Sequence, residues 1–195
     1  MKPNEAPDRP WKSIAMDFIR DLPKSEGDHA ILIVIDRLTK MAPVLPCTKE
    51  MDSRQFSDFF MREICRLHGL PKDIIMDRGS IFTSDLWKEM TKPLGIERRL
   101  SRAFHPQTDG QTEWTNSTLE QFLRAYVNYQ QDNWKELLPT AEFAYNNGYQ
   151  ESIKRTPFFA NDGVNPEYQT IGHLMQGKIT PPENMSQYTI PYKRK

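Results

Sequence analysis

The feature that most constrains the fold is a pair of segments, residues 14–19 and 30–40, that are rich in β-branched and aromatic residues. A short stretch containing proline, glycine and aspartate separates them. β-Branched and aromatic residues favour strands, whereas proline, glycine and aspartate favour a turn. The two segments therefore predict paired strands. Residues 41–47 predict a third strand, which must lie at an edge of the sheet because proline removes backbone donors.

Helices and further strands follow in alternation. Asp52 or Ser53 can cap a helix whose apolar residues recur at helical spacing, and Gly69 with Pro71 provides its end. The later predicted elements are a strand at 73–77, a helix at 84–94, a strand at 96–101, a long helix from residue 108 and a helix at 133–149. This order favours an α/β fold in which helices pack on the faces of a mixed sheet.

The long helix of the second half is expected to begin at a capping box formed by Thr108 and Gln111. Its apolar residues would face the core. Its polar residues share one stripe, at Glu113, Asn116, Glu120 and Arg124. Pro139 is expected to kink or restart the helix that follows.

The two ends of the chain lack such patterns. Residues 1–10 hold three prolines and four charged residues, which is typical of a loose leader. Prolines and glycines interrupt residues 164–195, for which we expect a poorly ordered tail, and residues 11–163 remain as the core domain. The longest apolar run, residues 30–35, is far shorter than the roughly 20 residues of a membrane span, so no membrane partner is expected.

The charges balance, with 26 Lys and Arg against 26 Asp and Glu. Taken alone, this neutrality argues mildly against a nucleic-acid partner, which usually requires a basic surface. Cys47 and Cys65 cannot form a disulfide framework, and with four scattered histidines they supply no paired zinc-ligand spacing. We expect two reduced thiols, with Cys65 on or near a buried helix face.

Three acids stand out by their placement. Asp17 interrupts an apolar strand, Asp77 ends a buried strand, and Glu113 lies in the first turns of the long helix. A buried carboxylate needs a partner, and a pair of divalent metal ions would provide one and support phosphoryl transfer. Oxygen ligands select Mg²⁺ or Mn²⁺ over zinc. The alternative is a salt bridge from Asp17 to an arginine, with Glu113 stabilised by the helix dipole.

A wider set of motifs carries a resemblance. From about residue 11 to 168 the chain resembles the catalytic core of the retroviral-type integrases, in particular those of gypsy-type long-terminal-repeat retrotransposons. The matching segments include IAMDFI, ILIVIDRLTKMA, FFMREICRLHGLP, DIIMDRGSIFTS, HPQTDGQTEWTNSTLEQFLRAY, NWKELLPTAEFAYNN and TPFFANDG. The D,D-35-E triad of that family falls on Asp17, Asp77 and Glu113, which are thereby the implied catalytic and metal-binding residues.

The resemblance implies an RNase H-like fold, with a five-stranded mixed sheet flanked by helices. It also implies two Mg²⁺- or Mn²⁺-dependent reactions at one site, with two ions expected. In the first, water frees a 3′-hydroxyl near the end of the element's DNA. In the second, that hydroxyl attacks the target DNA. DNA is thus the expected partner, and RNA is a further candidate. The chain is expected to form a homodimer or a higher oligomer. It would be synthesised in the cytoplasm, would act in the nucleus and would not be secreted.

Residues 102–110 resemble the mobile active-site loop of the family, with Gly110 as its hinge. Just before it, residues 88–106 hold five basic and two acidic residues, a local charge of 5 − 2 = +3, which suits phosphate binding; the alternative is a merely solvated face. The candidate DNA-contact residues are Arg98, Arg99, Arg102, His105, Gln107, Asp109, Gln111 and Asn116.

Two positions depart from the family pattern. Ser80 stands where the family usually has proline, and Trp114 stands where it has a basic residue, although its ring can stack on a base. Neither the zinc domain nor the C-terminal domain of full integrases is expected in this sequence. A second hypothesis is therefore a catalytically inactive, domesticated or fragmentary module for nucleic-acid binding or oligomerisation. A ribonuclease H-type hydrolase is a third, which the motif around Glu113 disfavours.

Overall fold

The computed structural model describes residues 7–48, 50–76, 88, 91–92, 94–100 and 106–167, with the backbone alone for residues 100 and 106–114. The strands in these ranges are β1 (Ser13–Ile19), β2 (Ala30–Asp36), β3 (Val44–Cys47), β4 (Asp73–Met76) and β5 (Glu97–Leu100). They form one sheet of five strands in the order β3-β2-β1-β4-β5. The strand β1 is antiparallel to β2 and parallel to β4, so the expected mixed sheet is confirmed.

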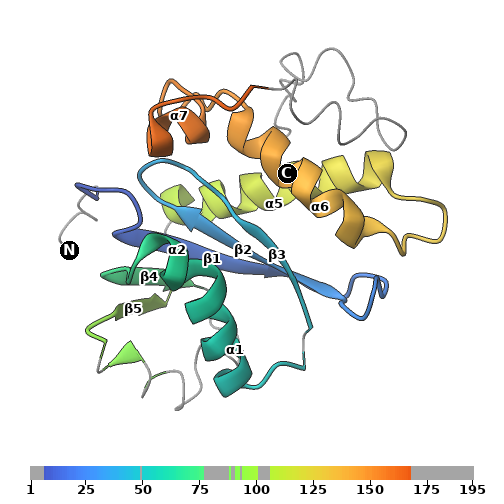
Figure 1. The fold of residues 1–195 in the computed structure, drawn as a ribbon, viewed down its shortest axis with the longest axis horizontal. Coiled ribbons are helices and arrows are strands. Elements are labelled where there is room, and N and C mark those ends of the chain that lie inside the picture. Colours follow the sequence, from blue (N-terminus) through green and yellow to red (C-terminus); the bar gives the residue numbers. More distant parts are fainter. Residues whose placement is uncertain are drawn as a thin grey trace.

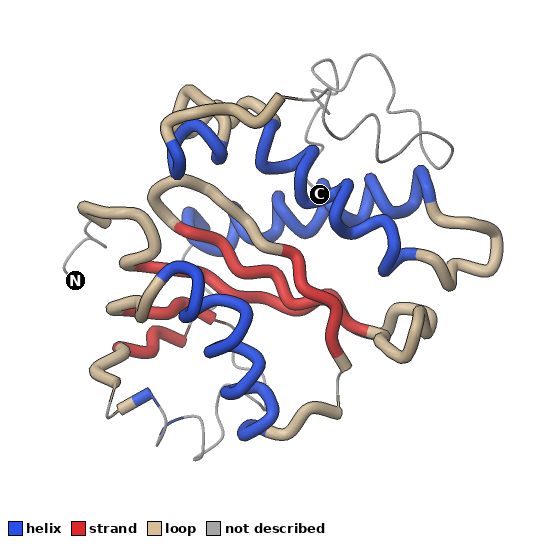
Figure 2. Tube along the Cα trace, in the orientation of Figure 1, coloured by secondary structure: helices blue, strands red, loops and turns tan. Residues whose placement is uncertain are grey.

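Helices cover both faces of this sheet (Figure 1). Those in the described ranges are α1 (Ser53–Phe60), the π-helical segment η1 (Met61–Cys65), α2 (Arg66–His68), α5 (Pro106–Tyr126), α6 (Trp134–Asn147) and α7 (Pro157–Asp162). Figure 2 shows the sheet between α1 and α2 on one side and α5 and α6 on the other. The molecule therefore has three layers, with a hydrophobic core on each side of the sheet.

Alternation along β1 decides which core each side chain joins. Ile14 and Met16 are buried in the core that contains Phe56 and Phe60 of α1. Ala15 and Ile19 belong to the other core, which α5 and α6 cover; its helical members include Leu119, Leu123, Trp134, Leu137, Leu138 and Ala141. Asp17 has the same parity as Ala15 and Ile19, so its side chain lies on the face that carries α5.

Local sequence signals placed several elements correctly. Asp52 caps α1: its Oδ1 accepts hydrogen bonds from the backbone N–H groups of Arg54 and Gln55, both at 2.8 Å, and the Gln55 side chain accepts one from the Asp52 N–H at 3.0 Å. Gly69 ends the helical run at a φ of +81°, a backbone conformation that glycine adopts without strain. The proline-containing strand β3 lies at the sheet edge, as predicted.

The start of the long helix was predicted incorrectly. The helix α5 begins at Pro106, so Thr108 and Gln111 lie inside it and do not form its capping box. Proline suits the first turn, where its missing N–H is not needed and its fixed φ is already helical. Residues 106–110 of the expected mobile loop are therefore helical, and Gly110 is not a hinge between loop and helix. The rest of that loop, residues 102–105, lies outside the described residues.

Pro139 does not restart the next helix, because α6 is continuous from Trp134 to Asn147. Proline removes only one intrahelical hydrogen bond. Four residues around it, Trp134, Leu137, Leu138 and Ala141, are buried against the sheet and hold both halves of the helix in place.

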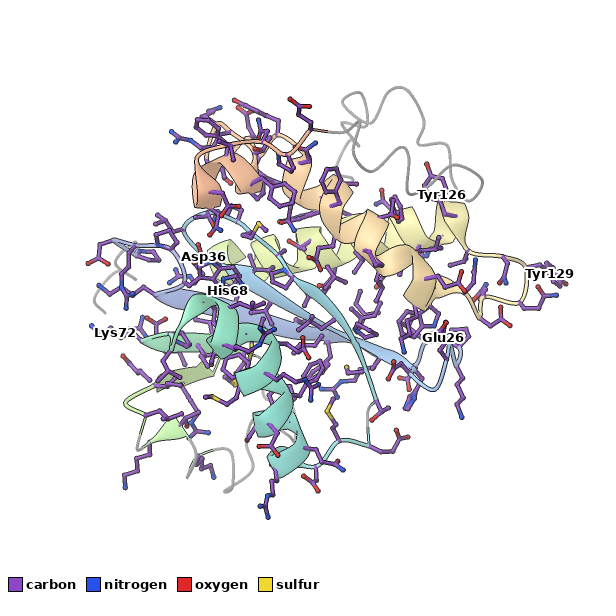
Figure 3. The ribbon with its side chains drawn as sticks, in the orientation of Figure 1. Glu26, Asp36, His68, Lys72, Tyr126 and Tyr129 are labelled. Carbon is purple, nitrogen blue, oxygen red and sulfur yellow. The ribbon has the colours of Figure 1, made fainter. Side chains whose placement is uncertain are left out.

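The first described residues are tied to the core through Trp11, which is buried. Its backbone N–H donates to the carboxylate of Asp36 at 3.0 Å, and its ring stacks on that of His68 with the centroids 3.5 Å apart. Asp36 and His68 are labelled in Figure 3 at the end of the sheet where α2 lies. This contact joins the N-terminal segment to β2 and α2.

Other expectations have mixed outcomes. Cys47 and Cys65 are both free, and Cys65 is buried in a helical segment, as expected. Cys47 is buried as well, and this burial raises the pKa of its thiol to about 12. No helix within the described residues is long and apolar enough to cross a membrane. Most of the predicted helix at 84–94, residues 1–6 of the leader and residues 168–195 of the tail lie outside the described residues.

Candidate active site

Asp17 lies on the central strand of the sheet. It is opposite Ile33 of β2, and the residue before it, Met16, is in register with Met76 at the end of the parallel strand β4. Each member of this methionine pair is followed in the sequence by one of the predicted acids, Asp17 or Asp77. Asp77 itself lies outside the described residues.

Within the described part of the chain, the carboxylate of Asp17 has two hydrogen-bond donors, and both are neutral. Its Oδ1 accepts from the backbone N–H of Phe18 at 2.8 Å, and its Oδ2 accepts from Nδ2 of Asn116 at 2.6 Å. Within the ranges that the structure describes, no lysine or arginine forms an ion pair with Asp17. The alternative of a salt bridge from Asp17 to an arginine therefore has no support among the described residues.

The side-chain amide of Asn116 is oriented by its hydrogen bond to Asp17. An ionised carboxylate only accepts hydrogen bonds, so the amide nitrogen must face Asp17 and the amide oxygen must point elsewhere. That oxygen, Oδ1, is buried and has no hydrogen-bond partner among the described residues. A buried acceptor without a donor costs about 1–3 kcal/mol, so the arrangement is expensive for the fold. A donor or a cation at this place would remove that cost.

The helix α5 places this amide next to the strand. Leu119 and Leu123 of the helix are buried in the core between α5 and the sheet. Thr115, the neighbour of Asn116, is 3.1 Å from the hydroxyl of Tyr145 on α6. Burial raises the pKa of Tyr145 to about 12, so this hydroxyl stays neutral at physiological pH. The backbone of Glu113 lies in α5 one turn before Asn116, and its side chain is not described.

The described DNA-contact candidates on β5 do not form one patch. Arg98 is in register with Ile74, whose side chain joins the α1 core, whereas Arg99 is in register with Ile75, which joins the α5 core. Neighbouring residues of a strand point to opposite faces, so Arg99 shares the face of Asp17 and Arg98 does not. Because side chains alternate along a strand, the sequence alone could have assigned Arg98 and Arg99 to opposite faces of the sheet.

Arg99 is also engaged in an ion pair. Its Nη2 is 3.1 Å from Oε2 of Glu97, and this hydrogen bond raises the pKa of Arg99 and lowers that of Glu97. The pair is largely exposed and contributes little to stability. Of the remaining candidates, Arg102 and His105 lie outside the described residues, and Gln107, Asp109 and Gln111 are described only by their backbone in α5.

Comparison with known proteins finds a family model that matches slightly more than half of the chain. The sequence model of the Integrase core domain matches residues 7–106. The Tf2-3 and Tf2-4 transposon polyproteins of Schizosaccharomyces pombe (strain 972) are each 38% identical to the chain over 158 residues. The aligned part is 81% of this chain and 12% of each polyprotein, so the chain spans only a small part of these relatives.

Solved structures share the fold at low sequence identity. The intasome of simian T-cell lymphotropic virus, in complex with the PP2A regulatory subunit B56 gamma, has a TM-score of 0.62 at 19% identity, covering 81% of this chain and 58% of that one. The HTLV-2 integrase catalytic core domain in complex with magnesium, in its trimeric form, has a TM-score of 0.57 at 19% identity and coverages of 78% and 97%. The expected RNase H-like fold, a five-stranded mixed sheet flanked by helices, is thereby confirmed.

Proposed function

The chain belongs to the integrase core domain family, and from this premise we propose that it is the catalytic core of a metal-dependent polynucleotidyl transferase. Its reactions would be the processing of DNA 3′ ends and their transfer into target DNA during integration of a retrotransposon. The observation that carries this proposal is the pair formed by Asp17 and Asn116. The Asp17 carboxylate on the central strand accepts a hydrogen bond from the amide nitrogen of Asn116 on α5, and the buried oxygen of that amide has no donor among the described residues.

The donor set fits a hard divalent cation. Asp17 has no cationic partner in the described part of the chain, and oxygen donors of this kind select Mg²⁺ or Mn²⁺. We propose that Asp17, Asp77 and Glu113 would hold two such ions. When bound, they would supply positive charge to the phosphoryl oxygens of the DNA. The chain itself supplies position: β1 fixes the backbone of Asp17, and Asn116 fixes the orientation of its carboxylate.

The proposed partners follow from the same function. The chain would bind the DNA ends of its element and the target DNA, with RNA as a further candidate, and it would act in the nucleus. The HTLV-2 core has been solved in dimeric and trimeric forms, and the simian virus protein in an intasome. This supports the proposal that the present chain works as a homodimer or a higher oligomer.

The test is a DNA-joining assay. Purified protein is incubated with Mn²⁺ and a branched DNA that mimics an integration intermediate, beside the variants Asp17→Asn and Glu113→Gln. The control is Asp58→Asn, which neutralises an exposed acid on α1, across the sheet from Asp17. We expect wild type and the control to resolve the branch, and the two site variants to lose at least about 10²-fold in rate, because the positioned charge is lost.

Equal rates in wild type and the Asp17 and Glu113 variants would contradict the proposal, as would no reaction with either Mg²⁺ or Mn²⁺. If DNA then bound equally well with and without divalent metal, and equally to all variants, the inactive binding module would be the better description. Cleavage of an RNA–DNA hybrid in place of DNA joining would indicate a ribonuclease H-type hydrolase.

A further inference from the structure

The helix α6 is tied by polar side chains to several other elements. It lies beside α5 over the same face of the sheet (Figure 1). The indole of Trp134 donates to the Pro23 carbonyl at 2.6 Å, and Glu142 accepts from the Val44 N–H at 2.8 Å. Asn146 binds the N–H and the carbonyl of Ala42 at 2.9 and 3.1 Å. These bonds attach α6 to the β1–β2 connection and to the segment that enters the edge strand β3.

The bond between Tyr145 and Thr115 differs from these, because it attaches α6 to α5. The two hydroxyl oxygens are 3.1 Å apart, and Thr115 is 1% exposed. Thr115 directly precedes Asn116, the residue that donates to Asp17. Successive residues of an α-helix point about 100° apart around its axis. The helix is therefore held by hydrogen bonds in two different directions at one level, by α6 through Thr115 and by β1 through Asn116.

We propose that Tyr145 is a positioning residue whose hydroxyl fixes the rotation of α5 about its own axis and thereby sets the hydrogen bond between Asn116 and Asp17. Apolar packing alone restricts the rotation of a helix less sharply, because the hydrophobic effect is not directional. A hydrogen bond has a preferred distance and angle, so the second bond restricts this rotation. Any effect on catalysis rests on the proposed function, whereas the effect on Asn116 does not.

The geometric part is tested without metal or DNA. The side-chain amide signals of Asn116 are followed by ¹H–¹⁵N NMR in the metal-free full chain. Tyr145→Phe removes the hydroxyl and keeps the ring, and Thr115→Val removes the other hydroxyl at nearly constant volume. We expect both variants to move the Asn116 signals, and Thr115→Ser, which keeps a hydroxyl, to leave them near their wild-type positions.

A matched control separates positioning from general loosening. Trp134→Phe removes a hydrogen bond of the same helix, from Trp134 to the Pro23 carbonyl, and also loses ring volume in the same core. It should destabilise the chain at least as much as Tyr145→Phe and leave the Asn116 signals in place. Unchanged signals in Tyr145→Phe would overturn the proposal, and so would an equal displacement in Trp134→Phe.

The catalytic part uses the joining assay. We expect Tyr145→Phe to lower kcat about 10-fold with little change in KM for DNA, since small misplacements of reacting groups are costly. Thr115→Ser should keep the wild-type kcat. Displaced Asn116 signals with an unchanged kcat would overturn the catalytic part of the proposal. If the wild-type protein itself were inactive, the proposed function would fail, but the NMR comparison would still test the geometric part.

Discussion

At the scale of single residues, Asn116 sets the stability of the fold against the proposed function. Its amide nitrogen donates to Asp17, while its buried oxygen has no partner in the part of the chain that the structure describes. Proteins tolerate such unfavourable groups mainly where activity requires them. The sequence suggested Asn116 only as a DNA-contact candidate. Its bond to Asp17 joins positions 99 residues apart, and no local pattern in the sequence reports a contact of that length.

Asn116→Leu tests this conflict. The change removes the donor to Asp17, which costs about 1.5–3 kcal/mol for a bond to a charged group, and it removes the unpaired oxygen, which returns about 1–3 kcal/mol. We expect the free energy of unfolding in urea to stay within about 1 kcal/mol of wild type while the DNA-joining rate falls sharply. A large loss of stability with a normal rate per folded molecule would show that Asn116 serves the fold and not the site.

At the scale of elements, prediction succeeded where a local rule determines the structure. The strands at the centre of the sheet follow from β-branched runs, and α1 follows from its capping residue and its terminal glycine. It failed at the start of α5, where Pro106 overrides the Thr108 capping box. The link between Tyr145 and Thr115 could not be predicted, because it pairs two hydroxyls 30 residues apart that are part of no periodic pattern.

The capping of α1 gives a prediction for this scale. Asp52→Ala removes the acceptor for two backbone N–H groups, and we expect it to lower the free energy of unfolding by about 1 kcal/mol. The control is Asp58→Ala, which removes an exposed acid from the interior of the same helix and replaces it with a stronger helix former. Equal effects of the two changes in urea unfolding would contradict the role assigned to the cap.

At the scale of the whole molecule, the balance of charges has a different meaning from the one it first suggested. A net charge of zero argued mildly against nucleic acid, yet the chain belongs to a family of integrase cores. A proposed site made of acids cancels part of a basic surface, and bound cations would restore positive charge there. Whole-chain charge is therefore no argument against the proposed function, and the candidate site rests on the placement of one acid in the central strand.

The most direct test of the central claim is the location of Mn²⁺ in crystals of the protein, determined by anomalous diffraction. If Asp17 belongs to a metal-dependent active site, an anomalous peak should lie about 2 Å from its carboxylate and should disappear in crystals of Asp17→Asn. The control variant Asp58→Asn should keep the peak. The absence of a peak beside Asp17 at saturating Mn²⁺, or a peak that persists in Asp17→Asn, would contradict the account.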